Sequence, residues 1–597
     1  MSQQNTSKKE KIFHGIPASP GIAIGKIFSI GGNVLEVEPR TIEESEIESE
    51  LKRYHEALKK AKSELDGLVK KAKRSFSEES AKIFQVHQTM LADPMVIEGT
   101  EQGIQNARKS ADHAFKDVMD RFEASVSKME DEYFRARAAD LYDLKCRVIR
   151  HIQGHHPVYF NRLTEPAIIF AKELTPSDTI SLETDKVLGF AMDFGGRTSH
   201  ATIVARSMNV PAVVALHDAG ESISNGDQAI IDGNAGRLIL NPGSKTQKLY
   251  EKRLEDYHKF ERKLEQVRSL PARTKDGKDI EVASNIEFPS EVDSVIENGG
   301  NGIGLYRTEY LFLADRQLPS EDYQYREYKK ITKKLNGQPL IIRTFDLGGD
   351  KPPQTIDLPA EKNPFLGLRG ARLYNDIGKK LFKTQLKAIL RASAHGNIML
   401  MFPMISCIPE LRYCIQTANE VKQELIEKNI KVADHIPIGV MIEVPSSAVI
   451  ADLLARECDF LSIGTNDLVQ YTLAVDRGNE NISYMYQPFN PAVLRLIHDI
   501  IKKGHEEGAW VGMCGEMASD PLATMILVGL GLDEFSVSPG SLLAVKDIIR
   551  RVDFSECSNL AEKAMNFSTG HETREYLQMV FSKKFHDLMF INMAETD

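Results

Sequence analysis

The stretches IGVMIEV (residues 438–444) and FLSIGTNDL (residues 460–468) decide the fold, because each is a short apolar run that ends in polar residues. Six more runs of this kind follow residue 271: IEVASNI (280–286), GIGLYRTEYLF (302–312), LIIRTFDL (340–347), NIMLMFPMI (397–405), WVGMCGEM (510–517) and EFSVS (534–538). Longer, helix-compatible stretches separate most of them. Eight strands that alternate with helices predict a closed (β/α)8 barrel.

In a barrel of this type, chemistry takes place at the carboxyl ends of the strands. The polar residues that interrupt or follow the apolar runs fall at that end, and they are Arg307, Arg343, Glu443, Asn466, Asp467, Arg477 and Cys514. A single arginine there is more often a salt-bridge partner, and a single carboxylate can simply cap a helix. The convergence of these residues on one rim favours a binding site over those structural roles.

The arginines restrict the class of ligand. A guanidinium pairs with phosphate or carboxylate at two points. The presence of Arg307, Arg343 and Arg477 at one barrel rim therefore favours a multiply anionic substrate. Glu443 and Asp467 would repel such an anion unless a cation lies between them. Mg²⁺ is the simplest choice, because it takes one or two protein carboxylates and completes its shell with substrate oxygens and water.

Cys514 has two interpretations. It lies in none of the spacings that mark a disulfide framework or a zinc site, and a thiol is a poor ligand for Mg²⁺. It is therefore either a buried structural thiol or the proton donor to a carbon bound at the rim. The residues alone leave both interpretations open.

A second candidate site lies at His200. The strand-like run KVLGFAMDF (186–194), the loop GGRTS (195–199) and the helix-like run HATIVARSM (200–208) place His200 in a first helical turn, with Thr198 or Ser199 as N-cap. The helix N-terminus favours an anion and disfavours imidazolium, which leaves a neutral nitrogen to act as nucleophile. A turn histidine without chemistry is the alternative. Because the predicted barrel is a separate domain suited to hold a phosphate-bearing anion, we favour the interpretation of His200 as a nucleophile.

The sequence predicts a multidomain α/β protein. Strand-like runs in residues 1–34 and 155–243 predict one α/β domain, and a glycine-poor helical block, 35–154, is inserted into it. Residues 244–270 predict a charged linker helix, and 271–597 the barrel. Charge runs within the helical block are typical of solvated helix faces.

Composition excludes several classes of protein. The net charge of -10 gives no reason to expect a nucleic-acid partner, and the six cysteines show no CxxC spacing. The N-terminus has no apolar signal region, and no apolar run approaches the length of about 20 residues that spans a bilayer. We therefore expect a soluble, cytoplasmic protein without membrane insertion.

From about Ile12 to Leu560, the chain resembles the Enzyme I family of the bacterial sugar phosphotransferase system. The motifs that carry the resemblance are colinear: ASPGIAIGK, LTPSDT, GGRTSHATIVAR, GIGLYRTEYLF, RTFDLGGDK, NPFLGLRGAR, GVMIEVPSSA, FLSIGTNDLVQYTLAVDRGN and GMCGEMASD. The resemblance implies an enzyme that transfers the phosphoryl group of phosphoenolpyruvate to its own histidine, releases pyruvate, and passes the group on to the phosphocarrier HPr. It also implies a homodimer formed through the barrel.

The resemblance assigns roles in the phosphohistidine domain. It implies that His200 is phosphorylated on Nε2, that Thr179 hydrogen-bonds the ring, and that the inserted helical subdomain docks HPr. Two departures fall in the docking helices, because Ser80 stands where the family pattern has lysine, and an acidic run is thinned to Asp93.

The resemblance also assigns roles at the barrel rim. It implies that Arg307, Arg343 and Arg477 hold phosphoenolpyruvate, with Asn466 and Asp467 beside them. Glu443 and Asp467 then become the Mg²⁺ ligands, and Cys514 becomes the general acid that protonates the enolate carbon.

Two rival functions belong to other classes. A pyruvate-phosphate dikinase or phosphoenolpyruvate synthase shares the histidine and the barrel but needs an ATP-grasp domain, whereas the stretch before His200 is mostly helical and has no glycine-rich phosphate loop. A non-catalytic sensor of phosphoenolpyruvate would not need His200, Cys514, Glu443 and Asp467, and all four are present.

Overall fold

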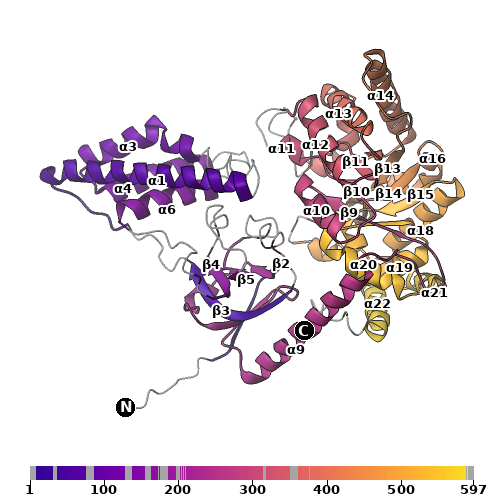
Figure 1. Ribbon diagram of the computed structural model, residues 1–597, viewed down its shortest axis with the longest axis horizontal. Helices are drawn as coiled ribbons and strands as arrows, with labels where there is room; N and C mark the ends of the chain where they lie inside the picture. Colours follow the sequence, from indigo (N-terminus) through magenta and orange to yellow (C-terminus); the bar gives the residue numbers. More distant parts are fainter. Residues whose placement is uncertain are drawn as a thin grey trace. The chain divides into compact units, whose positions relative to one another are not determined.

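A computed structural model shows how the chain folds (Figure 1). The structure describes residues 9–19, 21–30, 37–75, 87–127, 138–154, 163, 165–172, 174, 186–195, 202, 205, 208, 210–313, 318–349, 359, 361–375, 377–477, 479, 481–585 and 588. The described chain forms two compact units, and the boundary between them falls between His258 and Lys259. That boundary lies inside the predicted linker helix.

The N-terminal unit contains an eight-stranded sheet in the order β1-β8-β7-β3-β4-β5-β6-β2. Its strands are β1 (Lys11–His14), β2 (Ile16–Ser19), β3 (Ile22–Ile30), β4 (Ala167–Ala171), β5 (Val187–Met192), β6 (Ala212–Val214), β7 (Gln228–Asp232) and β8 (Arg237–Leu240). β3 to β6 pair in parallel, and the remaining pairs are antiparallel. Every residue of β4 is buried, which explains its uninterrupted apolar sequence.

A helical bundle occupies the chain between β3 and β4, as the insertion in the sequence predicted (Figure 1). Its helices are α1 (Ile47–Ser75), α3 (Pro94–Gln105), α4 (Ala111–Ser127) and α6 (Ala138–Ile152). α1 buries Tyr54, Ala57, Ala61, Leu65 and Leu68, which recur every three or four residues along one helical face. The Asp93 carboxylate accepts a hydrogen bond from the Met95 N–H and caps α3.

The linker helix α9 (Ser244–Val267) has an anchor in each unit. Near its start, the Tyr250 hydroxyl donates to the Asp232 carboxylate at 3.0 Å. Just after its end, the Lys546 ammonium donates to the Arg268 carbonyl at 2.8 Å. The two ends of the helix are therefore tied to different units.

The C-terminal unit is a closed barrel of eight parallel strands, as predicted. The strands are β9 (Glu281–Ile286), β10 (Ile303–Tyr306), β11 (Leu340–Arg343), β12 (Ile398–Phe402), β13 (Ile438–Ile442), β14 (Phe460–Ile463), β15 (Trp510–Met513) and β16 (Glu534–Val537). The run GIGLYRTEYLF is not one strand, because its strand ends at Tyr306 and a short helix begins at Tyr310. Arg307 therefore lies in the loop at the rim.

Helices alternate with the barrel strands along the chain (Figure 1). They are α10 (Val292–Glu297), α11 (Tyr310–Leu313), α12 (Glu321–Lys334), α13 (Lys379–Ser393), α14 (Ile408–Glu427), α15 (Pro445–Val449), α16 (Ala451–Ala455), α17 (Thr465–Leu473), α18 (Pro491–Glu506), α19 (Pro521–Leu530), α20 (Leu542–Arg550), α21 (Phe554–Ala564) and α22 (Gly570–Lys584). A buried apolar cluster includes Met401, Met441 and Cys514, and Phe460 within it stacks on Trp510 at 4.7 Å. No helix of the described residues is long and apolar enough to cross a bilayer.

Close packing of α19 against α21 gives a test of the barrel. A Cβ atom on Gly529 would lie 2.0 Å from the Cys557 carbonyl oxygen. We expect Gly529→Ala to destabilise the barrel by about 1–3 kcal/mol, because the backbone of α21 must move away. Trp510 is the chain's one tryptophan, so its fluorescence reports barrel unfolding in denaturant.

Gly540→Ala is the control, because a Cβ there would meet no atom within 4 Å. Equal unfolding midpoints for the two variants would contradict the packing interpretation.

Candidate active site

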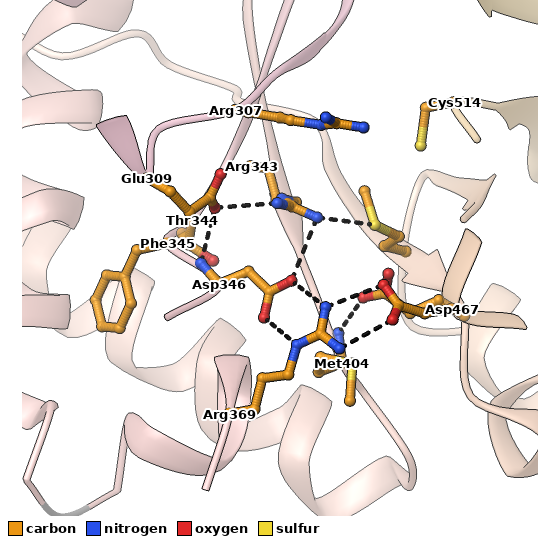
Figure 2. A network of polar contacts seen from close by, with 12 residues as sticks. Arg307, Glu309, Arg343, Thr344, Phe345, Asp346, Arg369, Met404, Asp467 and Cys514 are labelled. Carbon is orange, nitrogen blue, oxygen red and sulfur yellow. Dashed lines mark hydrogen bonds and ion pairs between the residues drawn. The ribbon is translucent and has the colours of Figure 1, made fainter. Parts of the chain in front are cut away.

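The carboxyl ends of the barrel strands bring six buried charged side chains together, and we call this set the rim cluster. Its members are Glu309, Arg343, Asp346, Arg369, Glu443 and Asp467. Arg343 ends β11, Glu443 follows β13, and Asp467 lies in the first turn of α17 after β14. The strand-end rule therefore places these three predicted residues at one rim, as Figure 2 shows for Arg343 and Asp467.

Arg369 lies between two carboxylates at the centre of the rim cluster (Figure 2). Its Nε and Nη2 donate to the two oxygens of Asp346 at 3.0 and 2.9 Å. Its Nη1 and Nη2 donate to the two oxygens of Asp467 at 2.9 and 3.0 Å. Burial alone would lower the pKa of Arg369, but the two carboxylates overcome it and raise that pKa. The guanidinium therefore stays charged and links two rim loops.

Arg343 has a similar environment but keeps unused hydrogen-bonding capacity. Its guanidinium pairs with Glu309 at 3.1 Å and with Asp346 at 3.5 Å. Burial opposes its charge, but the carboxylates outweigh burial and raise the pKa of Arg343. Among the described residues, Arg343 Nε and Glu309 Oε2 are buried polar atoms without a hydrogen-bond partner. Such atoms are costly unless a ligand or water satisfies them.

Glu443 is fully buried and accepts a hydrogen bond from the Met404 N–H at 2.7 Å. Burial, followed by the carboxylates of Asp467 and Asp346, raises the pKa of Glu443. The rim cluster holds more carboxylates than guanidiniums, so its ionised form has an excess of negative charge. A divalent cation would offset that excess.

No group of three or more His, Cys, Asp or Glu side chains in the described part of the chain is arranged to hold a metal ion. Mg²⁺ commonly takes only one or two protein carboxylates. Glu443 and Asp467 are compatible with that smaller ligand set.

Three predicted residues lie half-buried outside the rim cluster. Arg307 donates to Glu287 at 2.9 Å, and Figure 2 shows its side chain extended across the rim. Asn466 donates to the Glu516 carboxylate at 3.1 Å and accepts from the Glu516 N–H at 2.9 Å. Arg477 follows α17, and its backbone N–H donates to Gln470.

Cys514 directly follows β15 and is 2% exposed. The Ser462 hydroxyl donates to its sulfur at 3.2 Å. Burial raises the pKa of the Cys514 thiol to about 11, although Ser462 and the arginines lower it in part. The thiol is therefore protonated near neutral pH, as a proton donor must be.

His200 and Thr179 lie outside the described residues, as do Thr198 and Ser199. The described residues that precede His200 in the chain include β5 and Asp193, which directly follows that strand. The Asp193 carboxylate accepts hydrogen bonds from the N–H groups of Ala219 and Gly220 at 3.0 and 3.1 Å. These contacts hold Asp193, which directly follows β5, in place.

Sequence reasoning missed Glu309, Asp346 and Arg369. Glu309 and Asp346 lie within the quoted runs GIGLYRTEYLF and LIIRTFDL, so the strand-end rule could have included them. Arg369 lies in NPFLGLRGAR, just before a 3-10 turn that starts at Gly370. No strand end marks it, and only the tertiary structure brings it to the rim.

The site and fold agree with the families that match the chain. Three family models of PEP-utilising enzymes match it: the N-terminal domain at residues 14–137, the mobile domain at 163–236 and the PEP-binding domain at 261–554. These matches identify the chain as a PEP-utilising enzyme, with which the fold and the rim agree.

Curated relatives narrow the class. The phosphoenolpyruvate-protein phosphotransferase of Priestia megaterium is 44% identical over 96% of this chain and 99% of the relative. That of Bacillus subtilis is 42% identical over 95% of this chain and 99% of the relative. The chain belongs to the phosphoenolpyruvate-protein phosphotransferase family. A solution structure of Enzyme I (nEIt) is 39% identical and covers 41% of this chain and 99% of its own, with a TM-score of 0.37.

Substitution of Arg369 tests whether its ion pairs stabilise the rim cluster. We expect Arg369→Met to destabilise the barrel by about 3–5 kcal/mol, because the change leaves Asp346 and Asp467 buried without their cation. Denaturant unfolding followed by Trp510 fluorescence measures this.

Arg412→Met is the matched control, since Arg412 pairs with Glu457 at an exposed site. Loss of an exposed pair costs about 1 kcal/mol or less. If the two variants unfold at the same denaturant concentration, the central role of Arg369 is wrong.

Proposed function

We propose that this enzyme transfers the phosphoryl group of phosphoenolpyruvate to its own His200, releases pyruvate, and then passes the group to the phosphocarrier HPr. The observation that carries the proposal is the acid-rich, arginine-linked rim cluster beside a protonated Cys514 thiol. Membership in the phosphoenolpyruvate-protein phosphotransferase family supports the same reaction.

The arginines bind the substrate in this proposal. Phosphoenolpyruvate carries a phosphate and a carboxylate, and Arg307, Arg343 and Arg477 match that charge. The unpartnered Nε of Arg343 supports the assignment, because a substrate oxygen would satisfy it. Arg307 exchanges its pairing with Glu287 for substrate, which is feasible because both side chains are partly exposed. Asn466 adds an amide donor at the same rim.

Glu443 and Asp467 would hold Mg²⁺. The excess of carboxylates in the rim cluster supports this, and both residues supply the hard oxygen ligands that the ion prefers. When bound, Mg²⁺ would neutralise charge on the phosphoryl oxygens. The arginines then orient the phosphate and stabilise the charge that develops during transfer.

The reaction balances with the residues of this chain. The neutral His200 nitrogen attacks phosphorus, the bond between phosphorus and the enol oxygen breaks, and the electron pair stays on the enolate. Cys514 gives its proton to the enolate carbon, which yields pyruvate and a thiolate. Solvent then reprotonates the thiolate. Thr179 holds the imidazole, and phosphoryl transfer requires the two units of the chain to approach one another.

The acceptor in this proposal is a protein. The bundle of α1, α3, α4 and α6 supplies the docking surface for HPr, because it is inserted in the domain that carries His200. The barrel forms a homodimer, and the protein acts in the cytoplasm.

Labelled phosphoenolpyruvate tests the proposal. With Mg²⁺ present, we expect acid-labile, alkali-stable label on the wild type and none on His200→Ala. The expectation follows from the chemistry of a phosphorus–nitrogen bond. Addition of HPr should then discharge the label, and a chelator should prevent labelling.

His14→Ala is the control, since His14 is an exposed histidine in β1 of the same unit. Undiminished label on His200→Ala, or equal loss in both variants, would refute His200 as the acceptor.

The thiol of Cys514 gives a further prediction. Because burial raises its pKa to about 11, its neutral form persists through neutral pH and is lost only as pH rises toward that value. At pH 8 we expect iodoacetamide to modify Cys514 at least about 100-fold more slowly than free cysteine, since only the thiolate reacts. The rate should rise about tenfold per pH unit up to pH 10. Peptide mass spectrometry measures it, and a rate that levels off near pH 8 would contradict a protonated thiol.

A further inference from the structure

Ser462 is a buried hydroxyl beside the thiol that the proposed reaction uses. It lies in β14, and its side chain is fully buried. Its hydrogen-bond partner Cys514 belongs to a buried apolar cluster that includes Met401, Met441 and Phe460. A hydroxyl in such surroundings is unfavourable by about 1–3 kcal/mol unless it makes a hydrogen bond. Ser462 makes that bond with Cys514.

The direction of this hydrogen bond matters for a proton donor. Ser462 Oγ donates to Cys514 Sγ at 3.2 Å, so the sulfur accepts. The thiol proton is therefore not held by Ser462. Cys514 Sγ donates it to the Ile463 carbonyl at 3.8 Å, a weak thiol hydrogen bond that leaves the proton available to a stronger acceptor. Once the proton has left, the same hydroxyl faces a thiolate, and a hydrogen bond to an ionised acceptor is stronger than one to a neutral acceptor.

The backbone of Cys514 is fixed independently of this bond. Asn285 Nδ2 donates to the Cys514 carbonyl at 3.0 Å, and Ser536 Oγ donates to Asn285 Oδ1 at 2.7 Å. These contacts come from β9 and β16. Ser462 adds what they lack, which is a contact with the sulfur atom itself.

We infer that Ser462 is a positioning residue for Cys514: its hydroxyl holds the sulfur in place and stabilises the thiolate that remains after protonation of the enolate carbon. This inference rests on the proposed function. It assigns Ser462 no contact with substrate, so loss of the hydroxyl slows turnover without weakening substrate binding.

Steady-state kinetics of pyruvate release test the inference. We expect Ser462→Ala to lower kcat about 10- to 100-fold, since a hydrogen bond to an ionised group is lost. The KM for phosphoenolpyruvate should stay within about twofold. The solvent deuterium isotope effect on kcat should increase, because proton transfer from Cys514 becomes more rate-limiting.

Ser284→Ala is the matched control. Ser284 is a buried serine in β9, and within the described part of the chain its hydroxyl has no hydrogen-bond partner. We expect its kcat to equal that of the wild type. A kcat for Ser462→Ala within twofold of this control, or a raised KM at unchanged kcat, overturns the inference.

A double-mutant comparison separates the role at the thiol from a general effect on the fold. In a Cys514→Ala background, Ser462→Ala should cause no further loss of the residual kcat. An equal loss in both backgrounds overturns the inference. If Trp510 fluorescence shows that Ser462→Ala is unfolded, Ser462→Cys replaces it under the same criteria, since a thiol is a weak donor.

Failure of the proposed function gives a different result. Wild-type protein that releases no pyruvate from phosphoenolpyruvate refutes that function. Normal wild-type turnover with an unaffected Ser462→Ala variant refutes only the inference. Alkylation of Cys514 needs no substrate, and its pH profile should move to higher pH in Ser462→Ala.

Discussion

The paired contacts of Arg369 with Asp346 and Asp467 are the interaction on which the barrel rim depends. Each carboxylate receives two hydrogen bonds from one guanidinium, and all three side chains are buried. Buried carboxylates remain ionised only when a cation and hydrogen bonds compensate for lost hydration. Arg369 supplies both, because the planar guanidinium can present a pair of donors to each of two carboxylates.

This pairing determines which groups are available to a ligand. Arg369 is saturated by its two carboxylates and the Tyr471 hydroxyl, whereas Arg343 Nε and Glu309 Oε2 have no hydrogen-bond partner among the described residues. Glu443 lies near the same carboxylates, and burial together with their charge raises its pKa. The rim is thus suited to take up a cation and an anion together. Burial acts in the same direction at Cys514, where it raises the pKa of the thiol and keeps it neutral and able to donate a proton.

Much of the fold could be predicted from local patterns in the sequence. The eight apolar runs became the eight barrel strands, because parallel strands are buried on both faces and leave an uninterrupted apolar sequence. The position of Arg343, Glu443 and Asp467 at the rim could be predicted, because the carboxyl end of a strand can be located from sequence alone. Arg369 was missed because it follows a long connection after β11 and is joined to Asp467 only by folding. The partners of Arg307 and Asn466, which are Glu287 and Glu516, were missed for the same reason.

The sequence by itself determined the alternation of strands and helices in the barrel, the inserted helical bundle and the residue types at the rim, since each depends on spacing along the chain. Only the tertiary structure decided how those charges are paired and which of them are buried. Ion pairing and pKa depend on distances between segments far apart in sequence, as between Arg369 and Asp467 or Ser462 and Cys514. No periodicity along the chain encodes those distances, because they arise only when the barrel closes.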